Sequence, residues 1–319
     1  MKDSYGREIE YLRISVTKQC NMKCVYCQPE SSECGSTHCD SLSPDDFHRI
    51  VGIMAGLGIK KVRLTGGEPL VRKDIAEIIK GISGIKGITD ISMTTNGIKL
   101  AEMAEELKAA GLMRVNISLD SLQPEKFKEI TGSSRYYDVK EGIRKAFEIG
   151  LWPVRINTVL IRGINDNEID DFIELAKDLP VDVRFIELMP FGKFGEDNRH
   201  RIIYGSQIVA ARPQLIRINE TDQSLPSEYY RIEGYKGRIG FISPISHKFC
   251  GSCNRIRLTC DGKLKPCLGC NDEVDLMPAL QNEAEDLEFF IKKAIYEKPA
   301  GHNFYSGEKS DRNMNEIGG

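Results

Sequence analysis

The 319-residue chain carries 44 basic and 47 acidic residues, so its formal net charge is −3. Its hydrophobic content of 40% and charged content of 29% are typical of a folded protein with a sizeable core. This charge argues against general nucleic-acid binding, which needs a basic face. No apolar run approaches the ~20 residues of a membrane span. The charged N-terminus lacks the apolar core of a signal peptide, so we expect a cytoplasmic protein.

In such a compartment, ten cysteines are better explained by metal or cluster ligation than by disulfides. They form two groups, at 20–39 and 250–270, which predicts two sites. The first group opens with Cys20, Cys24 and Cys27, directly after a strand-like run. A 4Fe-4S cluster normally takes one Cys thiolate per iron, so three thiols leave one iron open. The alternative is a structural zinc site completed by one of the downstream ligands Cys34, His38 or Cys39.

Short β-rich runs alternate with helical patterns as far as about residue 187, which predicts βα units and a parallel sheet. The predicted strands span 11–17, 60–65, 89–94, 113–119, 153–159 and 181–187. Helices are predicted from the Ser43-Pro44 start signal and at 74–81, 99–110, 138–149 and 167–178. Six such units make a partial (β/α)6 TIM barrel. The rhythm is lost near residue 190, and the polar, Gly-rich stretch 191–198 predicts a linker. We therefore expect a barrel domain at 1–200 and a smaller C-terminal, cluster-binding domain at 201–319.

Each predicted strand has an apolar face and a polar face, because side chains two residues apart share a face. The polar faces carry Arg13, Lys61, Arg63, Asn116, Ser118, Arg155, Asn157 and Arg184. If the helices cover the apolar faces, the polar faces line the lumen, which is then a wet, basic cavity. A half-exposed antiparallel sheet alternates in the same way, but the intervening helices favour the barrel.

Active sites of barrels lie in the loops that follow the strands. The Cys20 motif, the Gly-Gly-Glu-Pro run at 66–69 and the Thr-Thr-Asn-Gly run at 94–97 all follow predicted strands. The CxxxCxxC motif, with an aromatic before its last Cys, resembles the hallmark of the radical S-adenosylmethionine (SAM) superfamily. Gly-Gly-Glu-Pro matches the segment that contacts the SAM amino group there. The resemblance implies that SAM chelates the open iron, and matching positions imply a SAM site of Tyr26, Gly67, Thr94, Ser118, Arg155 and Met189. Lys is frequent in the family at the position of Arg155. The arginine of this chain keeps the positive charge but changes the hydrogen-bond geometry.

The second cysteine group has two interpretations. With Cys270, the pairs Cys250/Cys253 and Cys267/Cys270 are close to a four-thiolate zinc site. Without Cys270, the group is a second three-Cys cluster site, and Cys260 has no role in it.

The run Cys-x2-Cys-Asn-Arg-x-Arg-Leu-Thr-x-Asp-Gly, followed by Cys267-Leu, resembles the GTP 3′,8-cyclases of molybdenum cofactor biosynthesis. Gly318 and Gly319 end the sequence as in that family, so the similarity covers essentially the whole chain. It implies two 4Fe-4S clusters: Cys20, Cys24 and Cys27 hold one, and Cys250, Cys253 and Cys267 hold another whose open iron binds guanine. Cys270 lies where the family requires no thiol, and we interpret it as a free or redox-sensitive thiol.

A triphosphate needs several cations, and the planar fork of Arg suits phosphate. Six cations are predicted to converge on the lumen, and the resemblance implies that they bind GTP: Arg13, Lys61, Arg63, Arg184, Arg255 and Arg257. It also implies that SAM is cleaved to methionine and a 5′-deoxyadenosyl radical, which removes the 3′ hydrogen of the GTP ribose. The ribose radical then attacks C8 of the guanine. Arg257, Gly318 and Gly319 are predicted to assist the later step.

The resemblance further implies an electron donor of the flavodoxin or ferredoxin type, a homodimer and a downstream pterin-forming enzyme. Two other functions stay open. A radical SAM peptide-modifying enzyme with an auxiliary cluster leaves Arg255, Arg257 and the Gly-Gly end unexplained. A two-site zinc-binding module is the alternative from another class. The sequence assigns no role to Cys34 and Cys39.

Overall fold

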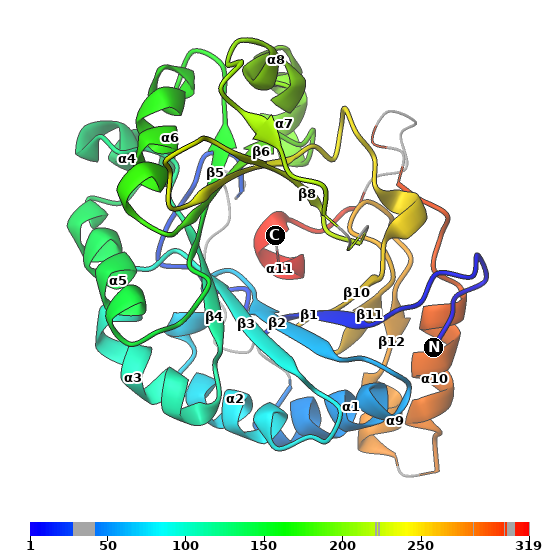
Figure 1. Cartoon of the computed structure of the whole chain (residues 1–319). Coiled ribbons are helices and arrows are strands. Elements are labelled where there is room, and N and C mark those ends of the chain that lie inside the picture. The colour runs from blue at the N-terminus through cyan, green and yellow to red at the C-terminus, as the bar shows by residue number, and fades with distance from the viewer. Residues whose placement is uncertain are drawn as a thin grey trace.

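The computed structural model describes residues 1–27, 42–220, 222, 224–282, 284–302, 304 and 310–318. In this part of the chain, parallel strands curve around a central lumen, and helices lie outside them (Figure 1). Neighbouring strands from β1 to β6 pair in parallel, in chain order. These strands are β1 Tyr11–Ser15, β2 Lys61–Thr65, β3 Asp90–Thr95, β4 Arg114–Ser118, β5 Arg155–Leu160 and β6 Asp182–Glu187. The predicted βα barrel is confirmed.

The C-terminal half extends the same sheet at both edges. β9 (Arg238–Ile242) pairs in parallel with β6, and β10 (Arg255–Leu258) pairs in parallel with β1. Antiparallel strands continue outward from these two: β11 Lys263–Lys265 and β12 Val274–Asp275 beyond β10, then β8 Ser227–Arg231 and β7 Ile216–Arg217 beyond β9. One sheet therefore runs through both predicted domains, and the division near residue 200 stays a prediction.

The helices between β1 and β6 lie where the sequence predicts them, with one addition, α4. They are α1 Pro44–Gly56, α2 Ile75–Ser83, α3 Leu100–Ala110, α4 Pro124–Thr131, α5 Tyr136–Glu148 and α6 Ile169–Asp178. Ser43 caps α1 by accepting a hydrogen bond from the backbone N of Asp46, which confirms the start signal. The predicted linker at 191–198 contains the short helix α7 (Gly192–Asp197).

The remaining described helices are short or lie toward the C-terminus. They are η1 Pro69–Val71, η2 Asp166–Glu168, η3 Arg199–Arg201, α8 Gly205–Ala210, η4 Cys250–Ser252, α9 Met277–Gln281, α10 Leu287–Tyr296 and α11 Met314–Ile317. α11 lies near the barrel axis in Figure 1, and Asn315 Nδ2 donates to the carbonyl of Lys18 at 3.1 Å. No helix in the described ranges is long and apolar enough to cross a membrane.

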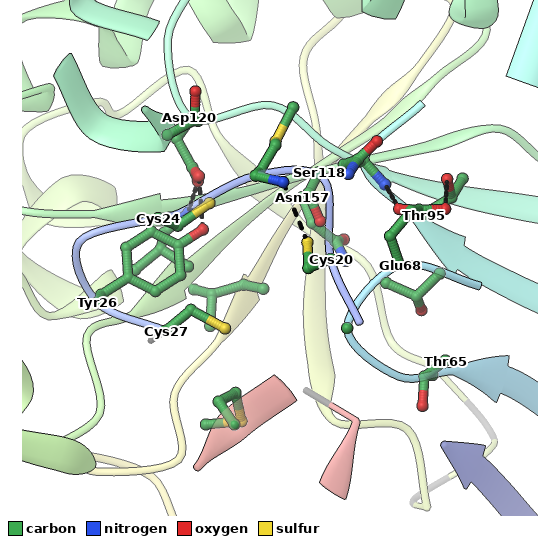
Figure 2. A pocket seen from close by; sticks show the side chains of 18 of the residues that line it. Cys20, Cys24, Tyr26, Cys27, Thr65, Glu68, Thr95, Ser118, Asp120 and Asn157 are labelled. Carbon is green, nitrogen blue, oxygen red and sulfur yellow. Dashed lines mark hydrogen bonds between the residues drawn. The ribbon is translucent and has the colours of Figure 1, made fainter. Parts of the chain in front are cut away.

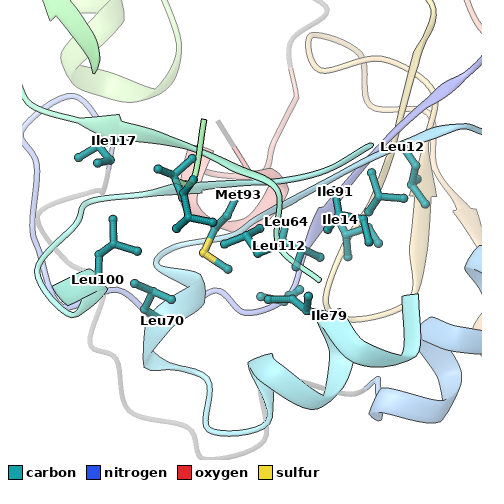
Figure 3. Close-up of a cluster of buried hydrophobic side chains, with 14 of the residues drawn as sticks. Leu12, Ile14, Leu64, Leu70, Ile79, Ile91, Met93, Leu100, Leu112 and Ile117 are labelled. Atoms are coloured by element: carbon teal, nitrogen blue, oxygen red, sulfur yellow. The ribbon is translucent and has the colours of Figure 1, made fainter. Parts of the chain in front are cut away.

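The apolar strand faces point outward and form the core. Leu12, Ile14, Leu64 and Met93 are fully buried and meet side chains such as Ile79 of α2 (Figure 3). Burial of such side chains contributes about 1.5–3 kcal/mol each. With this face packed against helices, the alternate side chains of each strand must turn toward the lumen.

Candidate active site

The first cavity lies where the strands end, and Figure 2 shows it from close by. Three side chains of the loop after β1, those of Cys20, Cys24 and Cys27, line it. The C-terminal ends of β3 and β4 and the loops that follow β2, β3, β4 and β6 supply its other walls, with Gly66, Gly67, Glu68, Thr94, Thr95, Asn96, Ser118, Asp120, Leu188 and Met189. The three predicted thiols are therefore brought together at the catalytic end of a barrel, as that fold requires.

Two of the three thiols of this cavity, those of Cys24 and Cys27, are hard to ionise in the protein alone because their pKa values are raised. Burial raises the pKa of Cys24 well above its usual value and that of Cys27 to about 12, and Asp120 and the neighbouring thiols add to the effect. In the described ranges, no three His, Cys, Asp or Glu side chains are arranged to hold a single metal ion. A 4Fe-4S cluster binds each thiolate through a different iron, so it does not need such convergence. The donor set fits a cluster, whose irons would supply the missing positive charge.

Tyr26 and Asp120 fix the turn that carries Cys24 and Cys27. The Tyr26 hydroxyl donates to Asp120 Oδ2 at 2.5 Å, and the backbone N of Val159 donates to Asp120 Oδ1 at 2.8 Å. Burial raises the pKa of Asp120 to about 6, although both donors oppose this shift. The loop after β1 is thereby tied to the ends of β4 and β5.

Glu68 joins the loop that follows β2 to the one that follows β3. Its carboxylate accepts hydrogen bonds from Leu70 N at 3.0 Å, Thr95 Oγ1 at 2.6 Å and Asn96 N at 2.6 Å. Burial raises the pKa of Glu68 to about 7 against these donors. The glycine before it is required by space, since a Cβ on Gly67 would lie 2.2 Å from the carbonyl oxygen of Gln19.

A second cavity adjoins the first. Its thiols are Cys250, Cys253 and Cys267, and Asn157, Ile186 and Met189 line both cavities. Its charged lining is basic: Arg7, Arg13, Arg63, Arg184, Arg255, Arg257 and Lys298. Ligands in the two cavities would therefore meet across a shared wall.

The arginines of the second cavity are buried cations close to one another. Burial lowers the pKa of Arg63 and of Arg257 to about 10, and nearby arginines contribute to both shifts. Arg184 donates to Asn157 Oδ1 at 2.6 Å and to Asn116 Oδ1 at 3.0 Å. Arg255 Nε and Nη2 are buried and have no hydrogen-bond partner among the described residues. Because an unpaired buried donor is unfavourable, this cavity fits an anionic ligand.

Cys253 and Cys267 of the second cavity ionise more easily than Cys24 and Cys27 of the first. Burial alone would raise the pKa of Cys253, but Arg255 and Lys298 outweigh it, and the pKa is lowered. A hydrogen bond from the Cys270 thiol is the largest cause that lowers the pKa of Cys267, to about 5. Three thiols beside cations, two of them with a lowered pKa, fit a second cluster, with Cys270 next to it as a hydrogen-bond donor.

Most predicted site residues lie where the sequence puts them. Five of the residues predicted to bind SAM line the first cavity: Tyr26, Gly67, Thr94, Ser118 and Met189. Five of the six predicted GTP-binding cations line the second: Arg13, Arg63, Arg184, Arg255 and Arg257. Their roles in binding stay predictions.

Two of the residues predicted to bind SAM or GTP line neither cavity. Arg155 stands at the start of β5, and its Nε lies 3.1 Å from Asp182 Oδ2. Lys61 stands at the start of β2, and its Nζ lies 3.6 Å from Asp222 Oδ2. Both side chains are at the N-terminal ends of their strands. Alternation along a strand predicts which face a side chain is on, but not how far along the barrel axis it lies.

Gly318 lies between the two cavities. Arg257 Nη1 donates to the carbonyl oxygen of Gly318 at 2.7 Å. A Cβ on Gly318 would lie 1.9 Å from Thr65 Oγ1, and its φ of +70° also favours glycine. Gly319, Cys34, His38 and Cys39 lie outside the described residues.

Some lining residues have no role in the sequence-based site. The alternation that identifies the arginines also identifies Asn157, because this residue is on the same polar strand face. Asp120 follows β4 as Glu68 follows β2, so its position directly after a strand could identify it as a site residue. Arg7, Lys298 and His302 line the second cavity from segments outside the βα units, where no motif identifies them.

Comparison with known proteins matches two family models to successive parts of the chain. Residues 14–176 match the model of the Radical SAM superfamily, and residues 181–304 match the Molybdenum Cofactor Synthesis C family. Among solved structures, Streptococcus suis SuiB has a similar fold, with a TM-score of 0.58 at 14% identity over 92% of this chain and 67% of that chain.

Curated relatives are much more similar. A GTP 3′,8-cyclase of Alkaliphilus oremlandii is 50% identical over 100% of both chains. A GTP 3′,8-cyclase of Listeria monocytogenes is 44% identical over 100% of this chain and 99% of the relative. Alignments of this coverage include both cysteine groups. The chain belongs to the GTP 3′,8-cyclase family within the radical SAM superfamily.

Proposed function

We propose that this chain converts GTP to 3′,8-cyclo-7,8-dihydro-GTP, the first step of molybdenum cofactor biosynthesis, with SAM and two 4Fe-4S clusters as cofactors. The observation that carries the proposal is the shared wall between two cavities, each with three cysteines, of which only the second is lined by arginines. The full-length relatives named GTP 3′,8-cyclase support the same reaction.

The residues divide between the two cavities. Cys20, Cys24 and Cys27 hold one cluster, and Cys250, Cys253 and Cys267 hold the other. When bound, the first cluster with SAM supplies one-electron radical chemistry, and the second supplies a Lewis-acidic position for the guanine base. The other residues bind, orient and exclude water.

The SAM site offers backbone groups, hydroxyl groups and the carboxyl groups of Glu68 and Asp120. Gly66 and Gly67 let the backbone approach SAM closely, and Thr94 and Ser118 offer hydroxyl groups from neighbouring strands. Among the described residues that line this cavity there is no lysine or arginine, so no side-chain cation there pairs with the three thiols.

The arginines hold the triphosphate in the second cavity. Arg13, Arg63, Arg184, Arg255 and Arg257 offer charge-assisted hydrogen bonds, which are the strong ones for phosphate. Asn157 and Met189, in the shared wall, hold the ribose of GTP next to the SAM cavity. Holding both reactants in one geometry is itself a large part of catalysis.

Arg257 and Gly318 assist the later step by position. The hydrogen bond from Arg257 to the Gly318 carbonyl keeps that guanidinium at the junction of the cavities. There it stabilises negative charge on the substrate during ring closure. Gly319 is part of the same proposal, by family resemblance.

The reaction needs electrons from outside the chain. We assign their source to a donor of the flavodoxin or ferredoxin type, in keeping with the cluster chemistry. Family resemblance supports a homodimer and a pterin-forming enzyme that takes the product. The eight cysteines of the described residues form no disulfide, which supports a cytoplasmic location.

Anaerobic incubation with dithionite, SAM and GTP tests the function. We expect 5′-deoxyadenosine to form in a GTP-dependent manner, and ATP in place of GTP serves as the matched control. If 5′-deoxyadenosine does not depend on GTP, the cyclase assignment is wrong even where the clusters are present. Iron, sulfide and zinc analysis tests the cofactors, because two zinc ions without sulfide would overturn the catalytic proposal.

A further inference from the structure

Arg7 connects three distant segments at the second cysteine site. Its Nε donates to Asp3 Oδ2 at 2.6 Å. Its Nη1 donates to the carbonyl oxygens of Cys250 at 2.9 Å and Ala300 at 3.0 Å, and its Nη2 donates to that of Pro299 at 2.6 Å. One buried guanidinium therefore joins the segment before β1 to a cluster cysteine and to the segment after α10. Its only carboxylate partner in the described ranges is Asp3.

Lys298 reaches the same site from the other side. The residue is 3% exposed, and its Nζ donates to the carbonyl oxygen of Pro266 at 2.6 Å. Pro266 directly precedes Cys267, so this bond holds the turn that presents the thiol. In the described ranges, Lys298 makes no ion pair with a carboxylate, whereas Cys253 and Cys267 line the same cavity. A buried charge without a partner is strongly unfavourable, which points to thiolates as its counter-ions.

The segment between these contacts packs directly on a cysteine. A Cβ on Gly301 would lie 2.9 Å from Cys250 Cβ and 3.1 Å from its Sγ. The 298–301 segment, tied down by Arg7 and Lys298, thus forms one side of the cysteine cradle.

We propose that Arg7 and Lys298 are positioning residues for the second cluster. Arg7 fixes the backbone at Cys250, Lys298 fixes the turn before Cys267, and the Lys298 ammonium offsets the negative charge of the thiolate-bound cluster. This inference rests on the proposed function, because it requires a cluster on Cys250, Cys253 and Cys267. Groups that hold metal ligands from outside typically change metal affinity by 10–100-fold when they are removed.

The test uses the full chain with Cys20, Cys24 and Cys27 replaced by Ala, so that all cluster iron belongs to the second site. In this parent we compare Lys298→Met, Lys298→Arg, Arg7→Met and Arg7→Lys. Arg144→Met is the matched control, because that arginine is exposed and bonds only to Glu141 and Glu148 on α5. After anaerobic reconstitution, iron release to a chelator and the midpoint potential of the cluster are measured.

We expect Lys298→Met and Arg7→Met to release iron about tenfold faster than the parent. Lys298→Met should also lower the midpoint potential, because a nearby positive charge favours the reduced cluster. Lys298→Arg should restore the potential, and Arg144→Met should match the parent in both measurements. If Lys298 only supported the fold, Lys298→Met would leave the midpoint potential of the retained cluster unchanged.

The outcomes separate the two proposals. If the parent takes up no iron, the second-cluster assignment fails, and the proposed function fails with it. If the parent holds iron but both Met variants release it at the parent rate with unchanged potential, the positioning role is overturned. Thermal melting of the cluster-free chains shows whether a Met variant folds. If a Met variant does not fold, the charge-retaining variants Arg7→Lys and Lys298→Arg decide. Unchanged iron release in Arg7→Lys together with an altered midpoint potential in Lys298→Arg contradicts the proposal.

Discussion

The two cysteine sites have the same number of proposed ligands but opposite electrostatic surroundings. The first is enclosed by hydroxyl groups, backbone and the carboxyl groups of Glu68 and Asp120. The second is enclosed by arginines and by Lys298. Accordingly, burial raises the pKa of the Cys24 and Cys27 thiols, whereas the pKa values of Cys253 and Cys267 are lowered.

This difference teaches how one fold keeps two similar cofactor sites distinct. A polyanionic substrate is attracted to the second cavity and not to the first. SAM carries its own positive sulfonium group, which suits a cavity without cations. Selection between ligands then follows from the side chains around each cysteine triad rather than from the triad itself.

Removing one thiol from each site should give the largest and most different effects. Cys20→Ala should reduce both SAM cleavage and GTP conversion to background, because both need the first cluster. Cys267→Ala should abolish GTP conversion but leave slow, GTP-independent SAM cleavage. Quantification of 5′-deoxyadenosine and of the cyclised nucleotide checks both.

Cys270→Ala is the matched control for the second thiol. It removes only the hydrogen-bond donor to Cys267, so conversion should stay within about tenfold of the unaltered protein. Loss of conversion to background would instead identify Cys270 as a ligand, and would contradict the three-thiol description.

Arg257→Lys tests whether positive charge alone in the second cavity is sufficient for GTP conversion. Lys keeps the charge but loses the planar fork. We expect kcat/KM for GTP to fall about 10- to 100-fold, as for loss of a charged hydrogen bond. Iron content and SAM cleavage should be retained. Arg135→Lys, an exposed residue paired with Asp138, is the control. Loss of both clusters in Arg257→Lys would make this arginine structural.

Ionic strength should separate the two cavities without any mutation. Raising the salt concentration from low to near-molar should weaken GTP binding by about tenfold, since salt screens attraction to a basic cavity. SAM binding should change much less, because no lysine or arginine of the described residues lines its cavity. Calorimetric titration of each ligand into the anaerobic protein measures this, and equal salt sensitivity would contradict the electrostatic comparison.

The smallest effect concerns Glu68. Its pKa is about 7 in the folded chain and lies near its usual value of 4.5 when unfolded. Since the folded-state pKa is raised, the contribution of Glu68 to stability is full below about pH 4.5 and is lost as the pH rises through about 7. Glu68→Gln should therefore destabilise the cluster-free chain more at pH 5.5 than at pH 8. Thermal midpoints of both chains at the two pH values check this, and a larger loss at pH 8 would reverse the sign.

Much of the barrel was predictable because its strands and helices have clear local patterns. The alternation in residues 11–17 and 60–65 indicates both the buried Leu12 and Leu64 and the lumen-facing Arg13 and Arg63. The spacing of the first cysteines indicated the cluster site for the same reason, since all three thiols lie in one short loop.

What could not be predicted depends on contacts between distant segments. β10 is four residues long, and nothing near it indicates that it pairs with β1. Arg7 and Lys298 meet only because both ends of the described chain come together at Cys250. Arg155 and Lys61 show the related limit, because a repeating pattern does not say how high along the barrel a side chain lies.

The parallel pairing of β1 with β10 also has a consequence for how the protein matures. Tyr11 aligns with Arg255, so this contact closes a loop of most of the chain. Contacts between such distant segments form late, since the entropy of loop closure opposes them. We therefore expect a folding intermediate in which β1–β6 are paired while the lumen is still open on the β1 side. Such an intermediate would give assembly proteins access to both cysteine triads before the barrel closes around them.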